Sequence, residues 1–477
     1  MAFFALPLLF IAFRGRLVAS IPAQVFTPPS PQGPLVQTAN YTCFSNDTLN
    51  DPVVSNGKAF NRIIHIWLEN TDFETTASTP LFETLAQQGI VLTNYNAVTH
   101  PSEPNYVAAA GGDFFGMHDD NMYHVPSNIS TVVDLLEDKQ VSWATYQESI
   151  PSDGFYGFLY NAPNYASPAS GTYPYYQRKH NPLVIFDAIS QDPARAKRIR
   201  SFNDFANDVV NGAPASALPA YWHPIYSFTL LGTLPQWVYI TPNIVESSPP
   251  PFISAKLTQI SFRQVNDGHD TLINYAASWL EYWFLPLLDD PRVNGPDTLI
   301  LLTFDENETK TEQNRVWALA IGGAVPSQLC GTTDDTLYTH YSGLSTVQAN
   351  WGLKSLGRQD TNASVSNVFS FVAQKTGYKN VNLPAGQVPM FNLSGAVPGP
   401  LTSALFVPFA APDLSALGAG GDGVLIRPGL NTSLTQASGL LPPPVNMLAL
   451  NRTTPWQMSP ETTSGEHIIP CADALCT

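Results

Sequence analysis

The chain has 477 residues, of which 44% are hydrophobic and 13% are charged, and its formal net charge is −16 at pH 7. This is enough apolar material to bury a large core, either in one large α/β domain with extensions or in two or three units. The negative charge argues against a nucleic-acid partner, because an acidic surface repels the phosphate backbone.

The first residues are typical of a secretory signal peptide, which we place at 1–20. An apolar run from Ala2 to Phe13 is too short to span a bilayer, and small residues follow it. Its arginines come after the apolar run rather than before it, so a short membrane anchor or a wrongly assigned start remain alternatives. No later segment has about 18 consecutive apolar residues, so we expect no membrane span in the mature chain. Residues 21–58 are rich in Pro, Thr and Asn and predict an extended arm.

Glycosylation sequons and cysteines agree with export. The Asn-x-Ser/Thr sequons predict N-glycans and begin at Asn40, Asn46, Asn128, Asn307, Asn362, Asn392, Asn431 and Asn451. Four cysteines in an oxidising compartment predict two disulfides. Cys471 and Cys476 could close a small loop, which would leave Cys43 to pair with Cys330, and other pairings stay open. We expect a secreted protein, either free or associated with the cell wall.

Strand-like and helix-like segments alternate within a predicted catalytic domain at 59–382. Strands are expected at 62–68, 90–98, 141–146, 237–241, 297–304 and 315–321. Helices are expected at 80–89, 271–288 and 340–353, and another could start within 106–112. Several strands are apolar on both faces. This pattern predicts an α/β fold with a mostly parallel central sheet flanked by helices.

Three segments have a different composition. Residues 383–477 are rich in Pro, Gly, Ser and Leu and predict an irregular, glycosylated tail. Residues 219–233 and 246–264 interrupt compact segments and have no clear period. We interpret these two as inserted loops, which could be retained introns.

Acidic and amide side chains follow two of the expected strands. Glu69 and Asn70 come directly after the first strand, and Asp305 and Glu306 come directly after a late apolar strand. In open α/β sheets, ligands bind outside the carboxyl ends of the strands. Oxygen ligands suit hard divalent cations. Taken alone, Glu69 and Asn70 would be interpreted as a surface loop with a turn-forming asparagine. Two adjacent acids after an apolar strand, such as Asp305 and Glu306, are costly unless they are solvated or bind a cation.

A serine lies in a turn between two prolines, His100-Pro101-Ser102-Glu103-Pro104-Asn105. The prolines restrict the backbone around Ser102. A metal nearby would lower the pKa of the Ser102 hydroxyl, and a helix after the turn would favour an anion beside it. The alternative is a turn that the prolines merely stiffen.

Three further clusters carry cationic or titratable groups. Asp267-Gly268-His269 precedes the long helix, His340 lies at the start of another helix, and Lys179-His180 belongs to a compact basic cluster. The basic cluster could contact phosphate. Each also has a structural explanation: a helix cap, a structural histidine and a solvated face, respectively.

In this order the motifs resemble the phosphoesterases that include fungal secreted acid phosphatases and bacterial phospholipases C, in the alkaline-phosphatase-like superfamily. The resemblance covers about 61–382. It implies that Ser102 is the nucleophile and that a divalent metal of unknown identity is bound by Glu69, Asn70, Asp305 and Glu306. It further implies that the catalytic residues His269 and His340 are either metal ligands or contacts to the phosphate and leaving group, and we favour the latter. The implied substrate-binding residues are Asn105, Lys179, His180 and Asp267.

The resemblance predicts an acid phosphatase that hydrolyses small phosphate monoesters through a phosphoseryl intermediate. Phospholipase C members continue the acidic pair with Gly-Phe-Phe-Asp-His, whereas Asn307 is followed here by Glu308-Thr309-Lys310. This difference favours a phosphomonoesterase. Two alternatives stay open: a phospholipase C-type phosphodiesterase, and a catalytically impaired glycoprotein in which the insertion at 246–264 displaces Asp267-Gly268-His269.

Overall fold

The computed structural model describes residues 56–163, 171–210, 234–243, 273–384, 391, 395–402 and 405–433. The predicted signal peptide, nearly all of the arm and both inserted loops lie outside the described residues. The same holds for Asp267, His269 and the end of the tail. Of the four cysteines only Cys330 is described, so the predicted pairings stay predictions.

The core of the described structure is an eight-stranded sheet with the order β11-β2-β10-β9-β1-β8-β4-β7. Its strands are β1 (Arg62–Leu68), β2 (Ile90–Leu92), β4 (Trp143–Gln147), β7 (Ile199–Ser201), β8 (Trp237–Thr241), β9 (Thr298–Phe304), β10 (Ala318–Ile321) and β11 (Thr332–Asp334). Neighbouring strands run parallel except at β10, which is antiparallel to both β2 and β9. The predicted mostly parallel sheet is confirmed.

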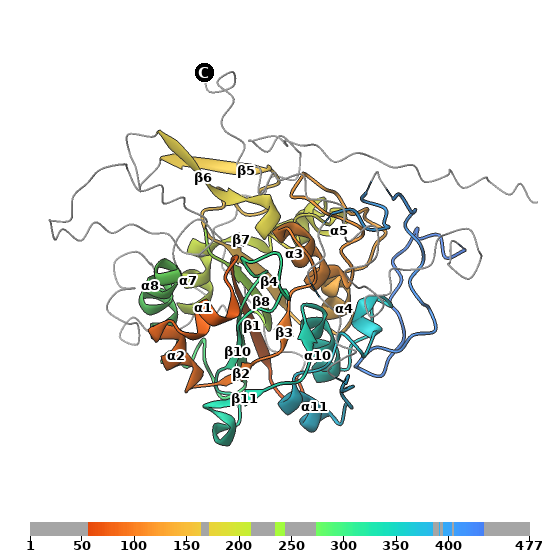
Figure 1. The fold of residues 1–477 in the computed structure, drawn as a ribbon. Coiled ribbons are helices and arrows are strands. Elements are labelled where there is room, and N and C mark those ends of the chain that lie inside the picture. Colours follow the sequence, from red (N-terminus) through yellow and green to blue (C-terminus); the bar gives the residue numbers. More distant parts are fainter. Residues whose placement is uncertain are drawn as a thin grey trace, which may run out of the picture.

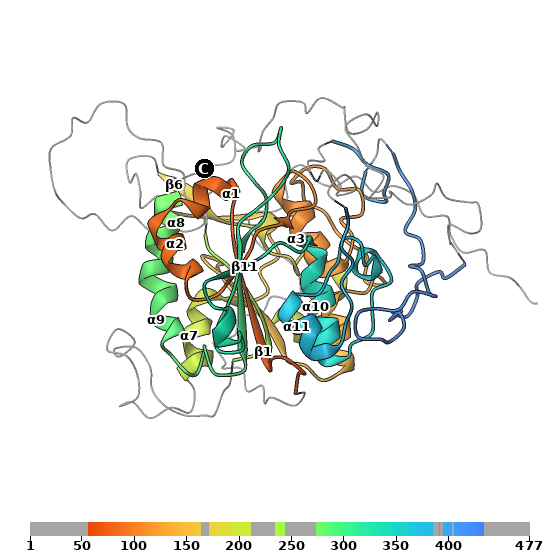
Figure 2. The ribbon, with the colours of Figure 1, turned by 60° about the horizontal axis from the view of Figure 1, so that its bottom comes forward.

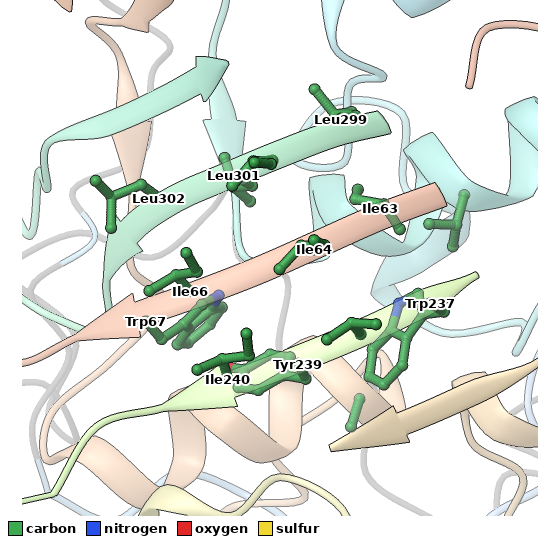
Figure 3. Close-up of a cluster of buried hydrophobic side chains, with 14 of the residues drawn as sticks. Ile63, Ile64, Ile66, Trp67, Trp237, Tyr239, Ile240, Leu299, Leu301 and Leu302 are labelled. Carbon is green, nitrogen blue, oxygen red and sulfur yellow. The ribbon is translucent and has the colours of Figure 1, made fainter. Parts of the chain in front are cut away.

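The central strands are buried on both faces, which explains their nearly continuous apolar sequences. Every residue of β9 is buried, and in β1 only Arg62 is partly exposed. Figure 3 shows Ile, Leu, Trp and Tyr side chains of β1, β8 and β9 packed against one another. β1 and β9 pair in parallel with Leu68 opposite Phe304, so both strands end at the same edge of the sheet.

Helices cover both faces of the sheet (Figure 2). One face carries α3 (Ser102–Gly111), α10 (Tyr341–Trp351) and α11 (Ser370–Thr376). The other carries α1 (Phe73–Ala77), α2 (Pro80–Ala86), α7 (Phe202–Val210), α8 (Ile273–Trp279) and α9 (Leu285–Leu288). A single π-helical turn, Leu280–Phe284, joins α8 to α9, so the predicted long helix over 271–288 is present from 273 onward. Shorter helices are α4 (Val132–Asp138), α5 (Asp187–Ser190) and α6 (Pro193–Ala196).

The structure differs from the predicted elements in two places near the site. The strand predicted at 90–98 is interrupted by a turn, which separates β2 from β3 (Tyr95–Asn96). β3 leaves the main sheet and pairs with β12 (Tyr338–Thr339). The helix predicted within 106–112 begins earlier, at Ser102. A proline is tolerated in the first helical turn, so Pro104 does not exclude a helix there.

A hairpin that the sequence did not predict lies above the sheet (Figure 1). It consists of β5 (Leu159–Pro163) and β6 (Thr172–Gln177), which pair antiparallel. A single 3₁₀ turn follows β6 and carries Arg178, Lys179 and His180. The basic cluster of Arg178, Lys179 and His180 is therefore positioned by the end of the hairpin.

Part of the predicted tail packs against the domain. Leu401 N donates to Phe115 O at 3.0 Å, and Leu425 N donates to Ser355 O at 2.8 Å. Helices and longer strands are lacking in residues 395–402 and 405–433, which agrees with the predicted irregular structure. Within the described ranges, no helix combines the length and apolar character needed to cross a bilayer.

Candidate active site

The parallel pairing of β1 and β9 brings the two acidic pairs together. Glu69 and Asn70 follow β1, and Asp305 and Glu306 follow β9 at the same edge. Asp305 Oδ1 accepts hydrogen bonds from the backbone N of Asn70 at 3.0 Å and of Glu306 at 2.7 Å. Asn70 has a φ of 41°, a left-handed conformation that asparagine tolerates better than most residues. The four predicted metal ligands therefore lie at one edge of the sheet.

Ser102 lies between the carboxylates of the two pairs. Its Oγ is 3.3 Å from Glu69 Oε2 and 3.4 Å from Glu306 Oε1. The predicted nucleophile is thus within hydrogen-bond distance of acids from two segments more than 200 residues apart. As the first residue of α3, Ser102 also lies at the positive end of the dipole of a ten-residue helix, which favours an anion.

Asn105 holds the serine turn in place. Its Oδ1 accepts from the backbone N of Val98 at 3.0 Å and of Thr99 at 3.2 Å, and its Nδ2 donates to Thr99 O at 2.8 Å. Nδ2 also lies 3.3 Å from Glu306 Oε2. The predicted role of Asn105 was substrate binding. Because these bonds engage both ends of its amide, the structure favours a positioning role.

Three side chains contact the acids, and the sequence analysis assigned none of them to this task. His100 Nδ1 lies 2.9 Å from Glu306 Oε2, and His180 Nε2 lies 3.1 Å from Glu69 Oε1. The Tyr106 hydroxyl donates to Glu69 Oε1 as well. The predicted role of His180 was substrate binding, but the structure places its ring against a predicted metal ligand. His100 shares the serine turn, and Tyr106 lies one helical turn after Ser102, so helical spacing could have indicated it.

Lys179 lies beside the start of α3. Its Nζ is 3.1 Å from Asp120 Oδ2, and Asp120 Oδ1 accepts from the backbone N of Glu103 at 3.0 Å. Asp120 therefore links the lysine to the helix end that carries Ser102. This arrangement places a cation close to the position at which the phosphate is predicted to bind.

His340 is in a different position from that expected of a proton donor. Its Nε2 lies 2.6 Å from the backbone O of Asp305, and its ring packs on Trp67 with centroids 4.2 Å apart. Burial lowers the pKa of His340 to about 3, with the Asp305 carbonyl acting in the opposite direction. The ring is therefore neutral at mildly acidic pH and its Nε2 proton is engaged. This contact differs from the one expected of His340, and its role in protonating the leaving alcohol stays a prediction.

The carboxylates of Glu69, Asp305 and Glu306 are at most 1% exposed. Burial raises the pKa of Asp305, and repulsion from Glu69 and Glu306 raises it further. Burial likewise raises the pKa of Glu306, as do the charges of Asp120 and Glu69. Asp305 Oδ2 is buried and has no hydrogen-bond partner among the described residues. Clustered, buried acids are costly unless a cation or a proton compensates their charge.

The donor set fits a hard divalent cation in its chemistry and charge, because all the predicted ligands offer oxygen. The arrangement of these side chains does not match a metal site in its geometry. Among the residues that the structure describes, no three His, Cys, Asp or Glu side chains form an arrangement that could hold a metal ion. The metal therefore stays a prediction.

Known proteins match this chain over more than half of its length. The family model described as the phosphoesterase family matches residues 67–354. An acid phosphatase of Aspergillus fumigatus is 42% identical over 348 residues, which cover 73% of this chain and 66% of that protein. A phosphate-repressible acid phosphatase of Penicillium chrysogenum is 41% identical, with 73% and 71% covered. This chain thus spans about two thirds of the length of these relatives. A solved structure of an alkaline phosphatase superfamily protein from Vibrio parahaemolyticus matches with a TM-score of 0.34 and 12% identity over 66% of this chain and 69% of that one.

Proposed function

This chain belongs to the phosphoesterase family, and on that premise we propose that it is an acid phosphatase that hydrolyses phosphate monoesters with Ser102 as nucleophile. The observation that carries the proposal is the position of the Ser102 hydroxyl, between Glu69 and Glu306 and at the start of α3. The named acid phosphatases among its relatives support the predicted class of hydrolases acting on phosphoric ester bonds.

Small monoesters are the proposed substrates. The relatives with 41–42% identity are named for acid phosphatase activity. The segment after the acidic pair also departs from the phospholipase pattern, because Glu308-Thr309-Lys310 follow Asn307. In the structure the Thr309 hydroxyl donates to Asp72 Oδ2 at 2.6 Å, so this segment is bonded to the start of α1.

The proposed reaction begins with binding of the phosphate group at the start of α3. The positive end of the α3 dipole and Lys179 stabilise its equatorial oxygens. A divalent metal held by Glu69, Asn70, Asp305 and Glu306 would supply the positive charge that lowers the pKa of the Ser102 hydroxyl. Tyr106 and His180 orient Glu69, and His100 and Asn105 orient Glu306.

Ser102 Oγ then attacks phosphorus in line, the bond from phosphorus to the leaving oxygen breaks, and a phosphoserine forms. Water hydrolyses the phosphoserine and releases inorganic phosphate. With His340 engaged elsewhere, His269 is the remaining histidine proposed to protonate the alcohol, and it lies outside the described residues. A protonated histidine would favour activity at acidic pH, since the unperturbed pKa of histidine is roughly 6.5.

A phosphatase assay on the secreted, full-length protein tests this proposal. We expect hydrolysis of p-nitrophenyl phosphate at acidic pH, loss of activity with a chelator, and little hydrolysis of p-nitrophenylphosphorylcholine. Ser102→Ala should abolish turnover, whereas Ser190→Ala should not. Ser190 is a similarly buried serine whose hydroxyl donates to Phe186 O beside its own helix. Wild-type turnover by Ser102→Ala would refute the nucleophile. Failure of the wild-type protein to hydrolyse either ester would favour the impaired glycoprotein.

We also propose export and N-glycosylation, which rest on the sequence alone. The structure narrows the sequons that could be used. Asn307 is 3% exposed and its Nδ2 donates to Thr309 O at 2.9 Å, so a glycan there would displace the segment beside the acids. Asn431, by contrast, lies in an irregular segment at the surface. Glycopeptide mapping should find Asn307 unmodified.

A further inference from the structure

Four polar atoms beneath the acidic site are buried and have no hydrogen-bond partner among the described residues. They are His65 Nε2, Trp67 Nε1, the Tyr239 hydroxyl and His340 Nδ1. The four residues are between 1% and 5% exposed. Buried donors and acceptors are nearly always satisfied by protein or by ordered water, because leaving them unpaired costs the free energy of their desolvation.

The four groups line one cavity. It also contacts Tyr95, Gly343 and neighbouring apolar side chains, and it leaves about 10 Å³ of free space. The ring centroids of Trp67 and Tyr239 are 5.4 Å apart, and those of Trp67 and His340 are 4.2 Å apart. Figure 3 shows Trp67 and Tyr239 side by side on the adjacent strands β1 and β8. A polar cavity of roughly 10–15 Å³ is enough for one water, provided that the water finds two to four polar partners.

The hydrogen bond between His340 Nε2 and the Asp305 carbonyl determines whether His340 Nδ1 is a donor or an acceptor. The Asp305 carbonyl only accepts, so Nε2 carries the proton that lies between them at 2.6 Å. In the neutral ring Nδ1 is then an acceptor. The His340 side chain lines the cavity together with those of Trp67 and Tyr239, whose Nε1–H and O–H are donors. A water that accepts from these two donors can donate to His340 Nδ1 and to His65 Nε2. The four groups match the four hydrogen bonds of one water.

We propose that one ordered water occupies this cavity and, together with Tyr239 and Trp67, holds His340 in the tautomer that supports the Asp305 carbonyl. Tyr239 and His340 are thereby positioning residues for the segment Asp305-Glu306. The water and the tautomer stand independently of the proposed function, and only their effect on catalysis rests on it. Residues that hydrogen-bond to a metal-binding or catalytic group and hold it in position typically contribute about 10- to 100-fold to metal affinity or activity.

A joint X-ray and neutron structure of the full-length protein tests the water and the proton directly. We expect a water within hydrogen-bond distance of His340 Nδ1 and of at least one of Tyr239 and Trp67, and a deuteron on Nε2 of His340. A dry cavity between well-ordered rings, or a deuteron on Nδ1 instead, would overturn the proposal. Neither outcome depends on phosphatase activity.

Tyr239→Phe tests the positioning role, because it removes the hydroxyl and keeps the ring. We expect a decrease of about tenfold in kcat for p-nitrophenyl phosphate, with KM little changed. The matched control is Tyr146→Phe, on the neighbouring strand β4, where the hydroxyl bonds instead to Asp208 of α7. Equal kcat values for Tyr239→Phe and the wild type, or equal losses in both variants, would contradict positioning. If the wild type itself were inactive, the crystal would still decide on the water.

Gly343→Ala provides a second variant that should fold. A methyl group on Gly343 would meet only His65 Cε1, at 3.6 Å, which is ordinary contact. Alanine is favoured over glycine in a helix, so an empty cavity predicts a higher Tm. If the methyl narrows the cavity and expels the water, we expect Tm to fall by about 2 °C or more instead. A rise in Tm, with the wild-type cavity found dry, would count against the water.

Discussion

At the scale of single residues, Asn105 shows how one side chain connects the nucleophile turn to the acidic pair. Its amide accepts two backbone N–H groups and donates both to Thr99 O and to Glu306. Only an amide offers an acceptor and two donors in this arrangement, whereas an aspartate offers acceptors alone. The requirement for asparagine at position 105 therefore comes from its hydrogen-bonding groups rather than from its size.

Asn105→Asp should damage both stability and activity. The change removes the donor to Thr99 O and places a carboxylate about where Nδ2 lies, 3.3 Å from Glu306 Oε2. We expect a loss of at least about 2 kcal/mol in the free energy of unfolding, measured by urea denaturation, together with a lower kcat. Asn203→Asp is the control, since Asn203 is exposed in the first turn of α7. Equal stability of the two variants would contradict the role of Asn105.

At the scale of elements, an ionic cluster joins the loop after β4 to β7 and α7. Arg200 of β7 lies 3.6 Å from Asp153 Oδ2, 3.6 Å from Asp204 Oδ2 and 3.1 Å from Asp208 Oδ2. One guanidinium thus faces three acids in a buried place. Burial, followed by repulsion from Asp204, raises the pKa of Asp153 to about 8, and Arg200 opposes the shift.

This cluster should make the protein more stable at acidic than at alkaline pH. The pKa of Asp153 is higher in the folded state than its usual 3.8, so the folded protein binds this proton more tightly. The contribution is complete below pH about 4 and is lost as pH rises through about 8. We expect a higher Tm at pH 5 than at pH 8.5, and a smaller difference in Asp153→Asn. That variant can keep the bond that Asp153 Oδ1 accepts from Ser201 N.

Asp138→Asn, at the surface, serves as the control and should leave the difference in Tm unchanged. If Asp153→Asn showed the full pH dependence of the wild type, Asp153 would not be its source.

The sequence predicted those elements whose pattern is determined locally. β1 and β9 could be recognised because both faces are buried, and α10 because its length and start fit a helix. The short strand β7 gives no apolar signal because it carries the charged Arg200. Two of the acids that pair with Arg200 lie in α7. β10 runs antiparallel to its neighbours. Strand direction depends on how the chain connects the strands, and the hydrophobic pattern of a strand is the same in either direction.

The candidate site was predicted in part for the same reason. Glu69 and Asp305 follow strands whose ends could be recognised, and Ser102 lies in a distinctive turn. The partners His100 and Tyr106 and the contact of His340 with the Asp305 carbonyl depend on side-chain directions after folding. His180 and Asn105 were placed near the site, but their contacts with Glu69 and Glu306 were not foreseen.

At the scale of the whole molecule, residues 405–433 are part of the folded unit. Arg427 donates to Ser127 O at 2.7 Å and pairs with Asp134. Asp134 caps α4 by accepting from Thr131 N at 2.9 Å, and it also pairs with Arg195. A segment assigned to the tail therefore supports a helix of the catalytic domain.

Arg427→Ala should lower the free energy of unfolding by about 1–3 kcal/mol, because Ser127 O and Asp134 lose a charged donor. We expect limited proteolysis to cut near residues 405–433 earlier than in the wild type. Lys354→Ala is the control, since its pair with Asp138 is partly exposed and should contribute no more than about 1 kcal/mol. Equal stability of Arg427→Ala and Lys354→Ala would indicate that the segment rests loosely on the domain.

The covalent intermediate offers the most direct measurement. Full-length protein is mixed with p-nitrophenyl phosphate, quenched in acid within the first turnovers and digested for peptide mass spectrometry. We expect a phosphoryl group on the hydroxyl of Ser102 and none in the Ser102→Ala protein. Rapid turnover that leaves Ser102 unmodified, with the phosphoryl group on another residue, would contradict the assignment of this serine.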